Sequence, residues 1–188
     1  MRYKFYSNSE KSWKAMYNAI SNAKDSVYLE MYIFDESMDK YDFLELVKEK
    51  ARAGVRVRII LDSLGSRELS KDAVEKLKLS GAEVFFISYF FHHTHRKILI
   101  IDKSLAFIGG VNFTKHSSKW DDLVLEINGK KIVDSIVNSF AKVYIASGGK
   151  DPEIKISINN KKKIIIDKTK TWLIEHFPMA KKFTLKKI

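Results

Sequence analysis

The sequence predicts an α/β domain in which a mixed β-sheet lies between helices. Up to about residue 87, short apolar segments alternate with amphipathic segments of helical period, which is the pattern of parallel βαβ units. From about residue 97, apolar segments follow one another with only a tight turn between them, as is typical of antiparallel strands. A long amphipathic segment then closes the series. One sheet that contains both kinds of pairing accounts for these observations.

The first half alternates helices and strands. Its helices are marked by apolar residues at three- and four-residue spacing, and two of them are followed by a glycine suited to a helix C-terminus. Its strands are short apolar runs rich in Val and Ile. On these grounds we expect helices over residues 10–24, 41–53 and 68–80, and strands over residues 27–34, 55–61 and 84–87.

The second half begins with a predicted hairpin. Residues 97–101 and 105–108 are apolar apart from Lys97, and the three residues between them are enough for a tight turn. We expect a further strand over residues 123–127 and a long helix over residues 129–146, where apolar residues again recur at helical spacing.

A domain boundary is predicted near Gly148 and Gly149. These glycines and Pro152 interrupt the helical pattern, and such residues are typical of connecting segments. We therefore divide the chain into a catalytic domain of residues 1–149 and a basic, lysine-rich extension of residues 150–188.

Composition limits the partners and the location. The formal net charge of +11 indicates an anionic partner, such as a phosphodiester, a nucleic acid or anionic lipid headgroups, although a lysine-rich genome would also produce it. The absence of cysteine excludes disulfides and thiolate metal sites. The sequence has no signal peptide and no apolar run near the ~20 residues that span a bilayer. We therefore expect a cytoplasmic location, or a peripheral one at the inner face of the cytoplasmic membrane.

The most informative residues lie around the predicted hairpin. His95 and Lys97 are two residues apart, so their side chains share a face in an extended segment. This pair suits attack on phosphorus, because the imidazole is a nucleophile and the ammonium neutralises the non-bridging oxygens. Asn112 adds amide donors, and Gly109 and Gly110 let the backbone pass close to a bound phosphate. A basic strand edge would explain a lone H-x-K, but not five positions at fixed spacing.

With Asp102, these residues form the pattern H-x-K-x(4)-D-x(6)-G-G-x-N. Here the chain resembles the phospholipase D superfamily, whose signature is this HKD motif. The chain carries a single copy of it. The resemblance runs from about residue 5 to about residue 145. Residues 28–34 look like the family's first core strand, and residues 54–66 are similar to its second strand and the loop that follows. Three features resemble the N-terminal half of bacterial cardiolipin synthases: the Gly-Ser loop after the second strand, the His-Arg-Lys sequence, and the W-x-D strand at residues 120–127.

The resemblance implies a site shared by two HKD motifs. In the superfamily, one histidine attacks phosphorus and forms a phosphohistidine, while the other protonates the leaving oxygen and then activates the incoming alcohol or water. The chain has five histidines but one H-x-K. A complete site therefore requires a homodimer or a second HKD half. Residues 150–188 would then be the start of a second repeat, a dimer arm or a lysine-rich tail.

The function implied by the resemblance is phosphatidyl transfer or phosphodiester cleavage, most like that of a cardiolipin synthase. A phosphatidylglycerol-like anionic phospholipid would donate its phosphatidyl group to His95, with no cofactor and no metal. Two alternatives stay open. One is a homodimeric, metal-independent HKD endonuclease, and the other is an inactive half that binds anionic lipid or nucleic acid.

Further residues are assigned supporting roles by the resemblance. Asp102, the D of the motif, would fix the strand turn and orient its neighbours. Glu30 matches a family carboxylate near the paired histidines, where it would hold the histidine tautomer. Asp122, the D of W-x-D, would brace Lys97.

The aromatic loop before His95 is a candidate substrate loop. It carries Phe90, Phe91 and His93, and we expect it at the mouth of the site. Its phenylalanines would pack in the core or a dimer interface, insert into acyl chains or stack on bases. Histidines outside the motif, such as His93, are more often ordinary loop residues than substrate ligands.

Overall fold

The computed structural model describes residues 2–36, 38, 40–87, 94–116 and 122–154, and the structural statements below concern these ranges. The strands and helices lie close to those expected from the sequence. The strands are β1 (Arg2–Tyr6), β2 (Ser26–Met31), β3 (Arg56–Asp62), β4 (Glu83–Ile87), β5 (Ile98–Ile101), β6 (Leu105–Gly109) and β7 (Val124–Asn128). The helices are α1 (Ser9–Ser21), α2 (Phe43–Arg52), α3 (Lys71–Leu79) and α4 (Lys130–Ala146).

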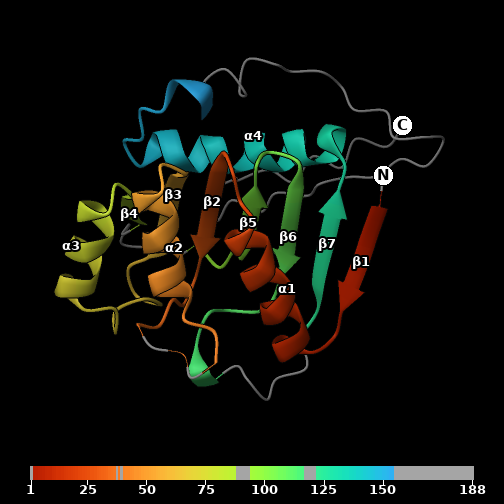
Figure 1. Cartoon of the computed structure of the whole chain (residues 1–188), viewed down its shortest axis with the longest axis horizontal. Coiled ribbons are helices and arrows are strands. Elements are labelled where there is room, and N and C mark those ends of the chain that lie inside the picture. Colours follow the sequence, from red (N-terminus) through yellow and green to blue (C-terminus); the bar gives the residue numbers. More distant parts are fainter. Residues whose placement is uncertain (1, 37, 39, 88–93, 117–121, 155–188) are drawn as a thin grey trace, which may run out of the picture.

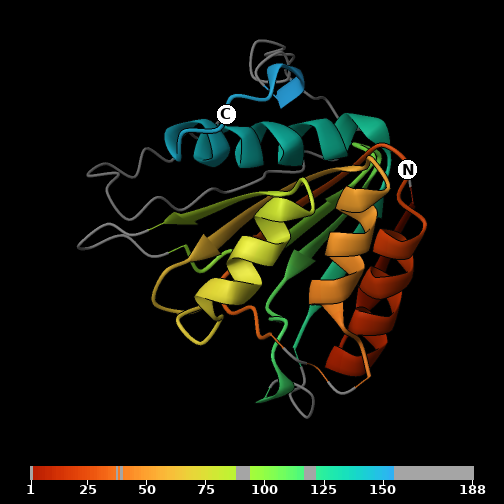
Figure 2. The same ribbon diagram turned by 60° about the vertical axis from the view of Figure 1, so that its left-hand side comes forward.

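The seven strands form one sheet in the order β1-β7-β6-β5-β2-β3-β4. β2, β3 and β4 are parallel, and every other pair is antiparallel, including β2 with β5. Helices α1, α2 and α3 cover one face of the sheet, and α4 covers the other (Figures 1 and 2). The predicted mixed sheet between helices is therefore confirmed.

The strand directions bring several chain ends to one edge of the sheet, the lower edge in Figure 1. β2, β3, β4 and β6 end there, and β5 and β7 begin there, because Glu30 pairs with Ile98 and Gly109 pairs with Val124. The motif residues at the start of β5 and after β6 therefore lie together at this edge, which we call the site edge.

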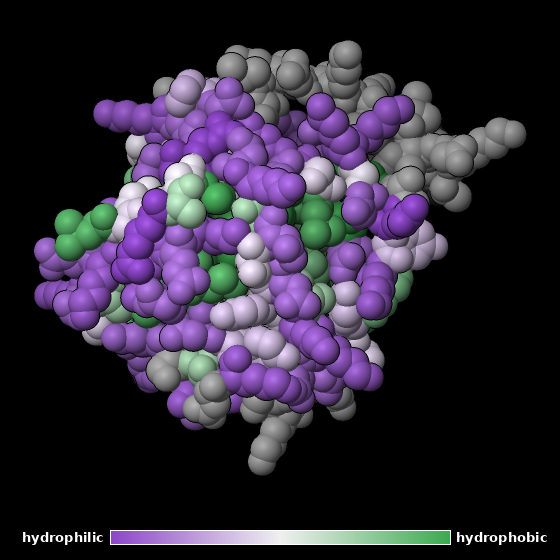
Figure 3. Space-filling model, in the orientation of Figure 1, coloured by the Kyte–Doolittle hydropathy of each residue, from purple (hydrophilic) through white to green (hydrophobic). Residues whose placement is uncertain are grey.

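The sheet separates two apolar layers. The larger lies between the sheet and α1–α3, and the smaller lies between the sheet and α4. β5 contributes to both, because Leu99 and Ile101 face the larger layer while Ile98 and Ile100 face the smaller. The outer surface seen in Figure 3 is mostly hydrophilic with small apolar areas. β5, which directly follows His95 and Lys97 in the chain, is thus held from both faces.

One element differs from the sequence-based expectation. β1 was not predicted, because four of its five residues are exposed and it extends the sheet only by pairing with β7.

The domain boundary after residue 149 stays a prediction, and some packing continues a few residues beyond it. Asp151 is buried and bridges Arg58 at 3.0 Å, and Ile154 is fully buried in the α4 layer. Residues 155–188 lie outside the described ranges, so the role of the extension stays a prediction.

Candidate active site at the edge of the sheet

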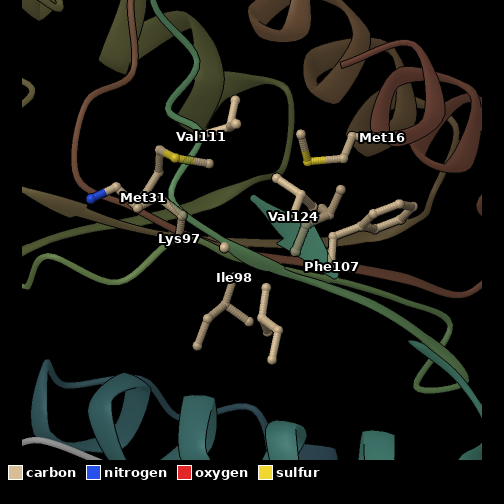
Figure 4. A pocket seen from close by; sticks show the side chains of 10 residues that line it. Met16, Met31, Lys97, Ile98, Phe107, Val111 and Val124 are labelled. Atoms are coloured by element: carbon tan, nitrogen blue, oxygen red, sulfur yellow. The ribbon is translucent and has the colours of Figure 1, made fainter. Parts of the chain in front are cut away.

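Lys97 lies immediately before β5, with its aliphatic stem in the larger apolar layer. The stem lines a small apolar pocket with Met16, Phe107 and Val124, and its nitrogen points away from these side chains (Figure 4). The ammonium donates a hydrogen bond of 2.9 Å to the carbonyl oxygen of His95. A buried stem with an outward nitrogen is the usual arrangement of a partly buried lysine. The packing therefore fixes where this positive charge lies.

Burial lowers the pKa of Lys97 from its usual value to about 8, although Asp122 and Asp62 act in the opposite direction. The ammonium is still the major form at neutral pH. Because it is poorly solvated, an arriving phosphate oxygen is an effective partner for it.

His95 is exposed at the site edge, with its ring 4.7 Å from the Tyr32 ring, centroid to centroid. Desolvation lowers its pKa, and the neighbouring Lys97 ammonium lowers it further against the opposing influence of Asp62 and Asp122. The imidazole is therefore neutral at physiological pH. A neutral, exposed imidazole is the form that can attack phosphorus.

Tyr32 was not among the residues expected in the site. Its ring contacts His95 and also lies under the Lys97 ammonium, whose nitrogen is 5.0 Å from the ring centroid. The sequence could have indicated Tyr32 only by its position, because it directly follows β2, the strand that pairs with β5. Without that pairing, the residue reads only as the end of an apolar run.

Asn112 is buried between two elements. Its side-chain Oδ1 accepts a hydrogen bond of 3.1 Å from the backbone N–H of Ile33, and its carbonyl accepts one of 2.9 Å from the indole of Trp13. The amide is therefore oriented by the segment that follows β2, with its N–H donors directed away from Ile33. Such donors suit a phosphate oxygen.

The glycine pair has a neighbour that the sequence did not indicate. A Cβ on Gly109 would lie 2.2 Å from the carbonyl oxygen of Leu123, and one on Gly110 would lie 1.9 Å from Oδ1 of Asp122. These glycines let β6 and the start of β7 approach each other closely. Their expected approach to a bound phosphate stays a prediction.

Asp122 lies beside this glycine pair. It accepts a hydrogen bond from the N–H of Leu123. Its charge also partly offsets the lowering of the Lys97 and His95 pKa values that burial causes. Within the described ranges no Asp122–Lys97 ion pair forms, and the bracing role expected of Asp122 stays a prediction.

Glu30 is fully buried on the α4 side of the sheet rather than against the His95 ring. Thr94 donates a 2.5 Å hydrogen bond to one carboxylate oxygen, and Arg96 lies 3.4 Å from the other. Arg96 also donates to the hydroxyl of Ser139 in α4 at 2.6 Å. Glu30 thus contacts the residues on either side of His95, and tautomer control remains a prediction.

Asp62 was also missed by sequence reasoning. This fully buried carboxylate accepts hydrogen bonds from the N–H groups of Leu64 and Gly65 through one oxygen and from Thr94 through the other, at 3.0, 2.9 and 2.9 Å. It therefore joins the turn after β3 to the residue before His95. The sequence feature that could have indicated Asp62 is its position at the end of a predicted strand, just before the Gly-Ser turn.

Asp102 lies at the opposite end of β5 from His95. Its carboxylate accepts hydrogen bonds from the N–H groups of Lys24, Asp25 and Ser26 at 3.1, 2.8 and 2.9 Å. Asp102 and Lys103 have φ values of 49° and 50°, as a tight hairpin turn requires. This carboxylate fastens the turn to the start of β2, about 16 Å of extended chain from Lys97.

The substrate loop that carries Phe90, Phe91 and His93 lies outside the described residues. Its two anchors, Ile87 and Thr94, lie at the site edge. No group of three or more acidic or histidine side chains in the described ranges is arranged to hold a metal ion. None of the described helices is long and apolar enough to cross a bilayer.

Comparison with known proteins identifies the family. The sequence model described as "Cardiolipin synthase, PLD-like domain" matches residues 16–144. The chain belongs to this phospholipase D-like family. It is 31% identical over 145 residues to a cardiolipin synthase of Clostridium perfringens (strain 13 / Type A), a match that covers 69% of this chain and 30% of that protein. The chain thus spans about 30% of the length of this curated relative.

Solved structures share the phospholipase D-like fold. NucT from Helicobacter pylori superimposes with a TM-score of 0.64 at 18% identity, over 78% of this chain and 96% of that chain. A phosphatidylserine synthase of Haemophilus influenzae Rd KW20 superimposes with a TM-score of 0.64 at 16% identity, over 84% and 41%. The fold and the family expected from the HKD motif are both confirmed.

Proposed function

We propose that this domain transfers a phosphatidyl group between alcohols through a covalent intermediate on His95. The observation that carries the proposal is the packed arrangement of an exposed neutral imidazole, a buried ammonium bonded to that residue's carbonyl, and one aromatic ring under both. This arrangement supports the proposal, because a neutral imidazole and a cation lie together at the site edge. The curated relatives are named cardiolipin synthases, which favours a phospholipid as the phosphodiester.

In the first step, an imidazole nitrogen of His95 bonds to phosphorus while the bond between phosphorus and the leaving glycerol oxygen breaks. That oxygen takes a proton from a second histidine. In the second step, an acceptor hydroxyl gives its proton to the second histidine and bonds to phosphorus, and the phosphorus–nitrogen bond breaks. The Lys97 ammonium and the Asn112 amide stabilise the charge on the non-bridging oxygens.

The second histidine comes from another HKD unit in this proposal. The motif occurs once in the chain, so the partner is a second copy or a separate HKD half. A lipid substrate would place the enzyme at a membrane surface. There the +11 charge favours anionic headgroups, and the site edge faces the bilayer.

The test is to incubate the chain with vesicles of phosphatidylglycerol and measure cardiolipin and free glycerol, with His95→Ala as the control. We expect both products with the wild type, neither with the variant, and acid-labile phosphate trapped on His95. Single-stranded DNA with chelator is the parallel arm. Cleavage of DNA without turnover of phosphatidylglycerol would replace the lipid proposal with the endonuclease alternative.

A further inference from the structure

We propose that Tyr32 is a positioning residue of this site, whose ring sets the direction of the His95 imidazole and keeps the Lys97 side chain a cation next to it. This inference rests on the proposed function and deepens it, because it names the group that holds the nucleophile and the charge together. Tyr32 acts through these two residues rather than on the substrate.

The geometry places one ring against both groups. The Tyr32 and His95 rings are 4.7 Å apart with an interplanar angle of 54°, and the Lys97 nitrogen is 5.0 Å from the Tyr32 centroid. Contact with a second ring restricts the rotation of an exposed imidazole. The face of an aromatic ring also attracts an ammonium within ~6 Å of its centroid.

The ring has little freedom to move away from the pair. A Cβ on Gly65 would lie 2.3 Å from the Tyr32 carbonyl oxygen and 2.8 Å from its ring, so the turn after β3 packs directly against Tyr32. The hydroxyl of Ser66 donates to the same carbonyl at 2.9 Å and accepts from the N–H of Phe34 at 3.2 Å. The backbone of Tyr32 is therefore fixed relative to this turn.

The electrostatics explain why the site requires such a ring. The ionisable groups that act on Lys97 are Asp122 and Asp62, and the same two carboxylates with Lys97 act on His95. Burial outweighs the carboxylates and lowers the pKa of Lys97 to about 8. The ring face supplies attraction for the cation without adding a negative charge that would repel an arriving phosphate.

The experiment compares Tyr32→Phe, which keeps the ring, with Tyr32→Leu and Tyr32→Met, which remove it. Tyr17→Leu is the matched control, because Tyr17 is also half-buried and its ring packs on the rings of Tyr41 and Phe43 rather than on His95 or Lys97. The pKa values of Lys97 and His95 are measured by NMR titration of the full chain. Turnover is measured on short-chain phosphatidylglycerol across pH.

We expect Tyr32→Phe and Tyr17→Leu to keep both pKa values and a kcat within about threefold of the wild type. Loss of the ring should lower the pKa of Lys97 by about half a unit. It should also reduce kcat about 30- to 100-fold with little change in KM, because the nucleophile is misdirected. The alkaline limb of the pH profile should move down with the pKa of Lys97.

Two results would overturn the inference. One is an unchanged or raised pKa of Lys97 in both ring-deleted variants that retain the wild-type fold by circular dichroism. The other is a loss in Tyr32→Phe equal to that in Tyr32→Leu, which would assign the effect to the hydroxyl. The NMR titration does not depend on turnover. A wild type that fails to use lipid would therefore count against the proposed function and leave the test of Tyr32 intact.

Discussion

Lys97 is charged at a position where burial disfavours the charge. Keeping the ammonium there lowers the free energy of unfolding of the domain. Folding makes the charged form of Lys97 less stable, since burial lowers its pKa to about 8 in the folded chain. In the unfolded chain the lysine has its ordinary pKa of ~10.4. The charge of Lys97 therefore does not stabilise the fold.

Replacing Lys97 with Met should therefore stabilise the folded domain. The full pKa shift would correspond to ~3 kcal/mol, and solvent screening at the open site edge reduces the expected gain to about 1–2 kcal/mol at pH 7. Urea unfolding of both proteins measures it. Between about pH 8 and pH 10 the unfolded wild type binds more protons than the folded wild type, so the free energy of unfolding of the wild type rises with pH. The difference in stability between Lys97→Met and the wild type should therefore disappear over this range. A Lys97→Met variant that is less stable at pH 7 would contradict the prediction.

Asp102 tests whether every residue of the motif takes part in the chemistry. Its carboxylate holds three backbone N–H groups at the end of β5 remote from His95. Asp102→Ala should lower the free energy of unfolding by about 2–3 kcal/mol, because charge-assisted hydrogen bonds are lost. At a temperature where the variant is folded, kcat should stay within a few-fold of the wild type. A loss of turnover as large as that of His95→Ala would assign Asp102 a catalytic role.

At the scale of elements, β5 is held to its neighbours through the residues that precede it. Glu30 in β2 bonds Thr94 and lies beside Arg96, and Arg96 reaches Ser139 in α4. His95 stands between two residues that a single buried carboxylate contacts. The position of His95 is therefore set by its neighbours in the chain as much as by its own side chain.

Glu30→Gln should weaken this connection, because the buried end of Arg96 loses its counter-charge. Removing one member of such a pair costs about 2–4 kcal/mol when the other is mostly buried. Thermal unfolding measures the loss, and the double variant Glu30→Gln with Arg96→Met should recover part of it. Glu45→Gln is the control, since Glu45 pairs with Lys48 and Arg52 at the exposed surface of α2. An unchanged melting temperature in Glu30→Gln would show that the network contributes nothing.

Most elements follow from the sequence, because apolar spacing and helix caps are local. Asn8, Asp42 and Ser70 each accept a hydrogen bond from the first turn of a helix, and the pattern around them predicts α1, α2 and α3. The pairing of β1 with β7 could not be predicted, since it joins residues more than a hundred positions apart.

The motif residues could likewise be predicted, because their types and spacing are local. Tyr32 and Asp62 could not be placed in the site from the sequence. Their contacts with His95 and Thr94 depend on which strands are neighbours in the sheet.

At the scale of the whole molecule, one domain supplies one HKD motif, and the proposed chemistry requires two histidines. If two copies share one site, a mixed dimer of wild type and His95→Ala has a single histidine and should be nearly inactive. In a fully exchanged equimolar mixture, only about one quarter of the dimers are wild-type pairs. The activity should therefore fall to about a quarter of that of the same total concentration of wild type.

Dilution gives the complementary measurement. Specific activity should decline as sedimentation shows the dimer dissociating. An equimolar mixture of His95→Ala and Lys97→Ala should stay nearly inactive, because each mixed site lacks one histidine and one lysine. Two results would contradict a shared site. One is activity proportional to the wild-type fraction in the mixture of wild type and His95→Ala, and the other is full specific activity in a protein that sediments as a monomer.

The two ends of β5 have different roles, since one fastens the sheet and the other carries His95. This separation affects how such a domain can change. The end near Asp102 is tied to β2 through backbone hydrogen bonds. The other end lies at the site edge, where β2, β3, β4 and β6 end. Substitutions beside His95 can therefore change that end while the fastening of the turn at Asp102 stays as it is.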